Sequence, residues 1–197
     1  TTSFPHYVPA GQRDNVASPH AVVEGTLRPV APDTSMATNP AGGIMTNARD
    51  EAKRLMIMAD SGRIAGGTPL YSIRTARNLW APVTILGNNP PPPQLAPLRA
   101  NFRGYALGLN MTDYRGYKVA EHTGGLPGFL SEVTTVPDLR LGVAVFTNAE
   151  SGPAFRAITL EVLDYYMGAS FDWLGAWKLV KARNDSANAA EMKASAG

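Results

Sequence analysis

Four short β-prone segments lie close together between residues 105 and 146, and their spacing is the strongest constraint on the fold. The segments cover residues 105–111, 117–121, 129–136 and 141–146. Turn sequences that contain Gly, Pro or Asp separate them. Connections this short leave no room for crossover helices, so consecutive strands should pair antiparallel. The pattern therefore predicts an antiparallel sheet.

Apolar residues recur at helical spacing ahead of this sheet, between positions 48 and 59. Either Thr46 or Asn47 can cap this helix, and Gly62 can end it. A second, short helix is predicted over residues 72–80.

A third helix is predicted after the sheet, from about residue 153 to 167. Pro153 suits its first turn and Gly168 its end. We expect one face to pack on the sheet; it carries Phe155, Ile158, Val162 and Tyr165. Further residues predicted to pack in the interior are Tyr166, Trp173, Trp177, Met45, Met56 and Met58.

Composition divides the chain into three parts: a helical and irregular part (1–98), the sheet with its helix (99–170) and a linker-like tail (171–197). Residues 1–43 show no sustained helical or strand period and are predicted to be irregular structure that lies against another element. Residues 87–97 include four consecutive prolines, which favour an extended connection. The tail is predicted to be a frayed helix or a linker.

The overall charge and the residue types present exclude several functions. The formal net charge is +2 and the basic residues are scattered, so a nucleic-acid partner is not expected. The absence of cysteine excludes disulfides and thiolate chemistry. No apolar run approaches the ~20 residues that span a bilayer. Neither His6 nor His20 has a carboxylate at metal-ligand spacing, so no metal or cofactor is predicted, and Asp113 with Arg115 is interpreted as a turn pair.

The strongest candidate chemistry lies where the second predicted strand ends. His122 and Thr123 are followed at once by Gly124 and Gly125. Glycines allow a ligand to approach closely, and exposed backbone N–H groups at such a place can bind an oxyanion. The threonine hydroxyl can donate to a substrate, and histidine can donate, accept or carry charge near neutral pH. On these residues alone, the alternative is a hairpin with a hydrogen-bonded structural histidine.

Several short sequence segments occur in a fixed order around this motif. The central one is His122-Thr123-Gly124-Gly125-Leu126-Pro127-Gly128-Phe129, and others lie at 18–21, 39–46 with Asp50, 105–109, 136–138 and 141–148. Together they resemble the class C β-lactamase-like and penicillin-binding-protein-like serine hydrolases over residues 18–173. The resemblance implies an α/β fold of the α+β type, with an antiparallel sheet packed against helices as part of a two-lobed enzyme.

The same resemblance implies roles for the central block. His122, Thr123 and Gly124 take the places of the family's third motif, which is Lys-Thr-Gly or His-Thr-Gly. Thr123 would contact the substrate, and His122 would position it or assist proton transfer. The N–H of Gly125 would form half of an oxyanion hole, and Leu126 and Phe129 would line the site. The histidine form is similar to esterase-like and D-amino-acid-peptidase-like members as much as to β-lactamases.

The family's nucleophile motif, Ser-x-x-Lys, is not found, because no Ser of this chain has Lys three residues later. No Tyr-x-Asn or Ser-x-Asn, the second motif, precedes the predicted sheet. We therefore expect a fragment of a serine hydrolase, inactive alone, whose partners are the upstream part of the same protein and a small-molecule or peptide substrate. The alternative is a non-catalytic binding module that retains the fold. Family resemblance favours export to the periplasm or beyond.

Overall fold

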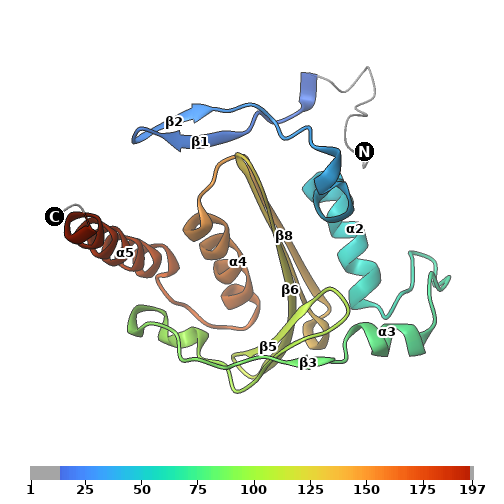
Figure 1. Ribbon diagram of the computed structural model, residues 1–197. Helices are drawn as coiled ribbons and strands as arrows, with labels where there is room; N and C mark the ends of the chain where they lie inside the picture. The colour runs from blue at the N-terminus through green and yellow to red at the C-terminus, as the bar shows by residue number, and fades with distance from the viewer. Residues whose placement is uncertain (1–13, 196–197) are drawn as a thin grey trace.

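A six-stranded antiparallel sheet forms the centre of the computed structural model, which describes residues 14–195 (Figure 1). The strands lie in sequence order, so each one pairs with the next along the chain. They are β3 (Thr84–Ile85), β4 (Arg103–Tyr105), β5 (Asn110–Tyr114), β6 (Tyr117–Leu126), β7 (Phe129–Val136) and β8 (Leu141–Thr147). The predicted antiparallel sheet is confirmed.

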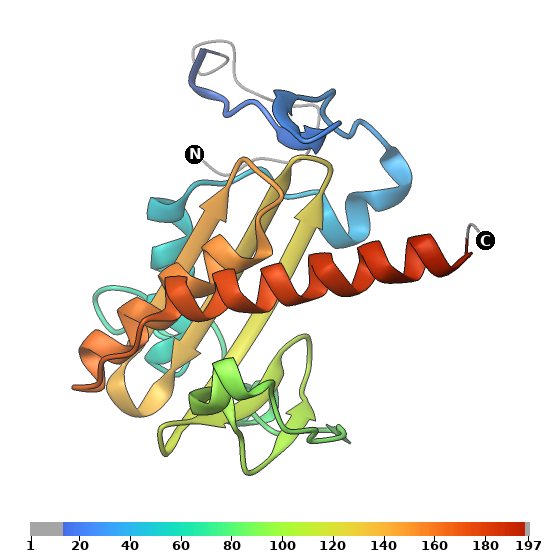
Figure 2. The same ribbon diagram turned by 90° about the vertical axis from the view of Figure 1, so that its left-hand side faces the viewer.

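Helices cover both faces of this sheet (Figure 1). On one face, α2 (Ala48–Ala59) packs so closely on β8 that a Cβ on Gly142 would lie 2.6 Å from the Cβ of Leu55. On the other, α4 (Gly152–Tyr166) packs on β7 and β8, and α5 (Trp173–Ser195) lies against α4. Figure 2 shows that the C-terminal part of α5 extends beyond the sheet. The shorter helices are η2 (Met36–Thr38), α1 (Asn39–Gly42), α3 (Ile73–Leu79), η3 (Pro93–Leu98) and η4 (Pro137–Leu139).

The predicted helix starts are confirmed at atomic detail. The side chain of Asn47, rather than Thr46, accepts a hydrogen bond from the Asp50 N–H at the start of α2. Ser72 caps α3 in the same way by accepting from the Thr75 N–H. These bonds satisfy backbone donors that a first helical turn leaves without partners.

The predicted strand over residues 105–111 is interrupted, because Tyr105 ends β4 and Asn110 begins β5. Residues 106–109 form a tight turn between them, in which the Ala106 N–H donates to the Leu109 carbonyl and Gly108 adopts a φ of +82°. The apolar side chains that resemble a strand are nevertheless buried, since Ala106 and Leu109 belong to a small core with Met111 and Ala120. The turn, and not a continuous strand, therefore places these side chains in the core.

The N-terminal segment also differs from the prediction of irregular structure. Residues 20–29 form a hairpin of β1 (His20–Val23) and β2 (Thr26–Pro29). Its turn uses Glu24 and Gly25, both with positive φ. Most of these side chains are exposed on both faces of the hairpin, which explains why no strand period is visible in the sequence. His6 lies outside the described residues.

The proline-rich connection is extended only in part, because Pro93–Leu98 form the 3-10 helix η3 with Leu95 in the core. Several predicted interior residues are exposed instead, namely Tyr165, Tyr166, Ile158 and Met56. The helix that contains three of them, α4, buries Phe155, Leu160 and Leu163 together with the polar Thr159 and Asp164. The predicted packing face of α4 is therefore confirmed for Phe155 and Val162, which lie in or against the main core, and wrong for Ile158 and Tyr165.

The hydrogen bonds of Asp164 explain why the α4 face that carries this polar residue is buried. Its carboxylate accepts hydrogen bonds from Arg115 Nε at 2.6 Å, from Trp173 Nε1 at 2.9 Å and from the Tyr114 hydroxyl. Arg115 therefore pairs with Asp164 of α4, and Asp113 accepts instead from Asn101 and Phe102, so the predicted Asp113–Arg115 turn pair is wrong. Burial tends to raise the pKa of Asp164, but these donors outweigh burial and hold the pKa below its usual value.

We expect Asp164→Asn to lower the free energy of unfolding by about 3–5 kcal/mol at pH 7, because it leaves the Arg115 charge without its buried partner. A carboxyl with a depressed folded-state pKa stabilises at neutral pH, and this contribution is lost as the pH falls through that pKa. The difference between wild type and variant should therefore shrink below about pH 4. Urea titrations at several pH values measure it. Asp185→Asn, which breaks an exposed pair with Lys181, should change little.

Candidate active site

The motif residues lie within a strand and not after it. β6 continues through His122, Thr123, Gly124 and Gly125 to Leu126. Pairing with β5 ends at Glu121, opposite Asn110, whereas pairing with β7 continues to Leu126, opposite Phe129. Within the described residues, the segment 122–126 is therefore paired on one side only and presents a free backbone edge on the other.

The register of the β6–β7 hairpin decides which backbone groups point to this edge. Leu126 and Phe129 close a two-residue turn, so they form a hydrogen-bonded pair, and hydrogen-bonded pairs alternate along an antiparallel ladder. Thr123 and Gly125 fall on the non-hydrogen-bonded positions, opposite Glu132 and Leu130. Their N–H and C=O groups consequently point away from β7, toward the free edge.

The side chains of the motif divide between the two faces of the sheet. Alternation places His122 and Leu126 on the face covered by α1 and α2, and Leu126 there contacts Gly42 of α1. Thr123 lies on the opposite face with Glu132. His122 and Thr123 are exposed, whereas Leu126 and Phe129 are half-buried. The structure thus brings the six predicted residues to one end of one hairpin, with His122 and Thr123 on either side of its edge.

The two motif glycines have different surroundings. A Cβ on Gly124 would lie 2.7 Å from the Ser131 hydroxyl oxygen on β7, which is too close without a rearrangement. A Cβ on Gly125 would meet only Leu130 Cδ2 at 3.4 Å, an ordinary contact. A side chain at position 124 therefore requires the Ser131 hydroxyl to move, whereas Gly125 leaves space beside the free edge.

The turn of this hairpin is fastened by residues that sequence reasoning did not assign to the site. The Glu150 carboxylate accepts from the Gly128 N–H at 2.7 Å, and the His20 N–H donates to the Gly128 carbonyl at 3.2 Å. Gly128 has a φ of +76° and touches Pro19 so closely that a side chain there would clash. The His20 ring in turn bonds the carbonyls of Ser18 and Asn148 through Nδ1.

A buried charge cluster lies beneath the motif on the α4 face. Glu132, which is 1% exposed, receives hydrogen bonds from Arg156 and from the Thr159 hydroxyl, the latter at 2.9 Å. Arg156 also donates to Glu121 at 2.8 Å. Burial raises the pKa of Glu132, and the nearby Glu121 carboxylate adds to this while Arg156 opposes it. No periodic pattern in the sequence indicates this cluster, because its members come from three separate elements, β6, β7 and α4.

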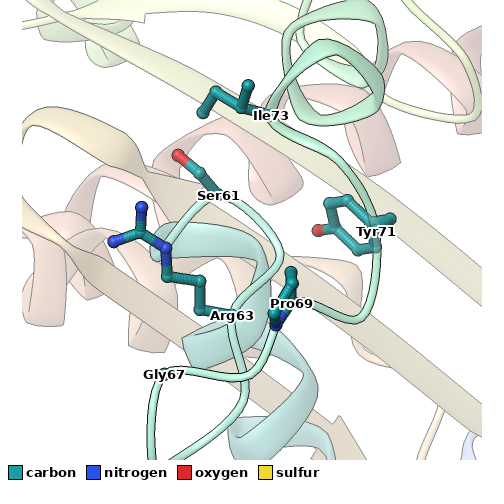
Figure 3. Close-up of a pocket in the computed structure, with 6 residues that line it drawn as sticks. All are labelled: Ser61, Arg63, Gly67, Pro69, Tyr71 and Ile73. Carbon is teal, nitrogen blue, oxygen red and sulfur yellow. The ribbon is translucent and has the colours of Figure 1, made fainter.

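Two cavities accompany these features. One, of about 200 Å³, lies on the α4 face and includes Glu121 and Arg156 in its wall. The other, of about 350 Å³, is formed by the loop between α2 and α3 and contains no motif residue; Figure 3 shows the Arg63, Ser61 and Tyr71 side chains around it. Within residues 14–195, no group of three His, Cys, Asp or Glu side chains is arranged to hold a metal ion.

The sequence contains one Ser-x-Asn tripeptide, Ser186-Ala187-Asn188, which lies after the sheet. All three residues are exposed on α5, and the Ser186 hydroxyl donates to the Ala182 carbonyl of its own helix. This tripeptide therefore has the environment of a solvent-facing helix and not of the second family motif. In the same described part of the chain, no helix is long and apolar enough to cross a membrane.

A comparison with solved structures supports the class that the fold and the hairpin define, a penicillin-binding-protein-like fold. The octameric penicillin-binding protein homologue from Pyrococcus abyssi superposes with a TM-score of 0.67 at 19% identity, over 86% of this chain and 34% of that chain. The Unguisins hydrolase of Aspergillus violaceofuscus is 30% identical over 123 residues, which are 59% of this chain and 20% of that protein. The chain thus spans about a fifth to a third of the length of these relatives.

The Beta-lactamase family model matches residues 3–166. The chain therefore belongs to the beta-lactamase family, and the resemblance predicted from the sequence is confirmed.

We expect Gly124→Ala to lower the free energy of unfolding by about 1 kcal/mol, because the added methyl group forces the Ser131 hydroxyl to move. Gly125→Ala, the matched control, should stay within about 0.5 kcal/mol of wild type. Ser131→Gly should remove most of the difference that Gly124→Ala causes. Chemical denaturation of wild type, the three single variants and the Gly124→Ala/Ser131→Gly double variant measures this coupling, and equal effects of the two alanine substitutions would contradict the packing argument.

Proposed function

We propose that this chain supplies one wall of the active site of a serine hydrolase that forms an acyl-enzyme, with the nucleophile on another segment. The observation that carries the proposal is the free edge of β6, where the family's third motif lies on an exposed strand. Membership of the beta-lactamase family and the hydrolase name of the Aspergillus relative support this reaction class.

The geometry of the edge suits binding of a substrate carbonyl. The Gly125 N–H points outward, and no side chain at Gly125 blocks the approach. It would donate to the oxygen that becomes negatively charged when a nucleophile attacks the carbonyl carbon. The Thr123 hydroxyl would donate to another oxygen of the substrate, and the Thr123 and Gly125 backbones could pair with an extended peptide-like substrate as an added strand.

His122 lies next to these groups but on the other face of the sheet. Its exposed ring can reach around the edge to orient the substrate or to transfer a proton to or from the leaving group. Leu126 and Phe129, which are half-buried on the same face as His122, would line the site. We propose esters, amides or D-amino-acid peptides as the substrate class.

The nucleophile has to come from elsewhere, because the chain contains no Ser-x-x-Lys sequence. β8 offers a place for another segment, since its seven residues pair with β7 on one side and with no other strand of the described region on the other. Unpaired edge strands readily accept a further strand. The alternative function, a binding module that kept the fold without the nucleophile, uses the same free edge of β6 for its ligand.

The hydrolase proposal predicts the behaviour of two variants. In a protein that joins this chain to a Ser-x-x-Lys segment, His122→Ala should lower kcat/KM by about 10²-fold or more. Thr123→Val should lower it by about tenfold, because one hydrogen bond to the substrate is lost. Chromogenic ester turnover and labelling by a fluorophosphonate probe measure both effects.

The chain alone should show neither turnover nor labelling. Turnover by the pure 197-residue chain that His122→Ala abolishes would contradict the proposal that the nucleophile lies on another segment. Labelling that never appears in the joined protein would favour the binding module.

A separate expectation concerns association. The chain alone should self-associate or remain bound to another segment, because the β8 edge and nearby apolar groups such as Phe146 are exposed. The structural relative from Pyrococcus is described as octameric, which agrees with association in this fold. Light scattering measures the mass, and a monomer across micromolar concentrations would contradict the expectation.

A further inference from the structure

The motif segment of β6 contributes little of its own to fixing the position of the strand. Residues 122–125 are exposed, two of them are glycines, and one backbone edge is unpaired within the described part of the chain. Register in a β-strand is set mainly by burial of one face, and it is weakly specified in exposed, glycine-rich strands. A shift of one residue would exchange the faces of His122 and Thr123 and turn the Gly125 N–H toward β7. The two-residue turn and the buried Val119 and Ala120 set the register at the two ends of this segment, and an interaction beside the motif would reinforce the register between them.

The charge cluster beneath the motif is placed to do so. Glu121 immediately precedes the motif on β6, and Glu132 stands directly opposite Thr123 on β7. One guanidinium nitrogen of Arg156, Nη1, donates to both carboxylates. The contact crosses from α4 to two adjacent strands at the residues that flank the motif.

The α4 side of this contact is itself held firmly. The Thr159 hydroxyl, three residues after Arg156, donates to the second oxygen of Glu132 at 2.9 Å. Arg156 and Thr159 belong to the helix that packs Phe155 and Leu160 into the main core. The position of Glu132 is consequently tied to the core and not only to its own strand.

Building on the proposed function, we propose that Arg156 is a positioning residue that holds the register of the motif strand through Glu121 and Glu132. A slip of β6 by one residue would carry Glu121 to the other face of the sheet, away from Arg156, and leave the guanidinium with one partner. Buried ion pairs contribute little net stability but can specify one arrangement over its alternatives. The clamp, as we call the Glu121–Arg156–Glu132 contact, thus reinforces, beside the motif, the register that the turn sets and in which Thr123 and Gly125 face the free edge.

Amide hydrogen exchange on the chain alone tests the clamp without requiring any hydrolysis. The N–H groups of His122, Gly124 and Leu126 point toward β7 and should be protected in wild type. In Arg156→Met, protection of these three amides should fall by about tenfold or more, as expected for loss of charge-assisted hydrogen bonds. The amides of the β7–β8 ladder should keep their protection.

Two further variants keep the test decisive if Arg156→Met does not fold, because that change leaves Glu132 buried without its cation. Arg156→Met combined with Glu132→Gln removes the buried charge and should fold with the same local loss of protection. Arg156→Lys keeps a cation and should restore at least part of it. Arg54→Met, the matched control, breaks an ion pair with Glu51 on α2 and should leave the three amides unchanged.

Unchanged protection in the double variant, or a loss shared equally with the β7–β8 ladder, would overturn the clamp. The outcome is separable from the proposed function. If exchange responds as expected but the joined protein never forms an acyl-enzyme, the clamp stands and the hydrolase proposal fails. If Arg156→Met lowers kcat of the joined protein without altering exchange, the clamp fails and the hydrolase proposal stands.

Discussion

The antiparallel ladder between β6 and β7 is the interaction on which the rest of this structure depends. Its two-residue turn sets which residues of β6 bond β7 and which face the free edge. The two ends of β7 are both held by other elements. Val136 at its C-terminal end lies in the core beneath α4, and Gly128, in the turn that precedes β7, bonds the N-terminal segment and Glu150. The motif is therefore located by a hairpin whose two ends are both anchored.

An exposed edge strand and a fixed geometry are competing requirements. Under the proposed function, substrate access requires that residues 122–126 stay unpaired on one side, and the segment then lacks strand pairing on that side as a source of stability. Contacts from other elements stabilise the motif strand instead. Arg156 and Thr159 of α4 bond the carboxylates of β6 and β7 on one face of the sheet, and residues 19–20 and 150 contact the turn. Precision at the edge comes from elements that do not touch a substrate.

The same contacts explain how a chain that spans a fifth to a third of its relatives can have a defined core. The sheet joins consecutive strands, so its central ladders form within residues 103–147. The helices that cover its two faces, α2 and α4, lie on either side of it in the sequence. Local pairing of this kind requires few long loops to close and favours independent formation of the sheet.

The sequence by itself determined the antiparallel sheet, the helix that starts at Thr46 or Asn47, the short helix over residues 72–80 and the family, because these depend on neighbouring residues. The sequence pattern predicted that the motif strand ends at residue 121, whereas β6 continues to Leu126. Only the tertiary structure decided which face of α4 is buried. Both faces of α4 are partly apolar, and the buried face is the one that carries Thr159 and Asp164. Thr159 bonds Glu132 on the sheet, and Asp164 bonds Arg115 in the turn beside the sheet. The clamp and the free edge were likewise invisible in the sequence, since each exists only when separate elements meet.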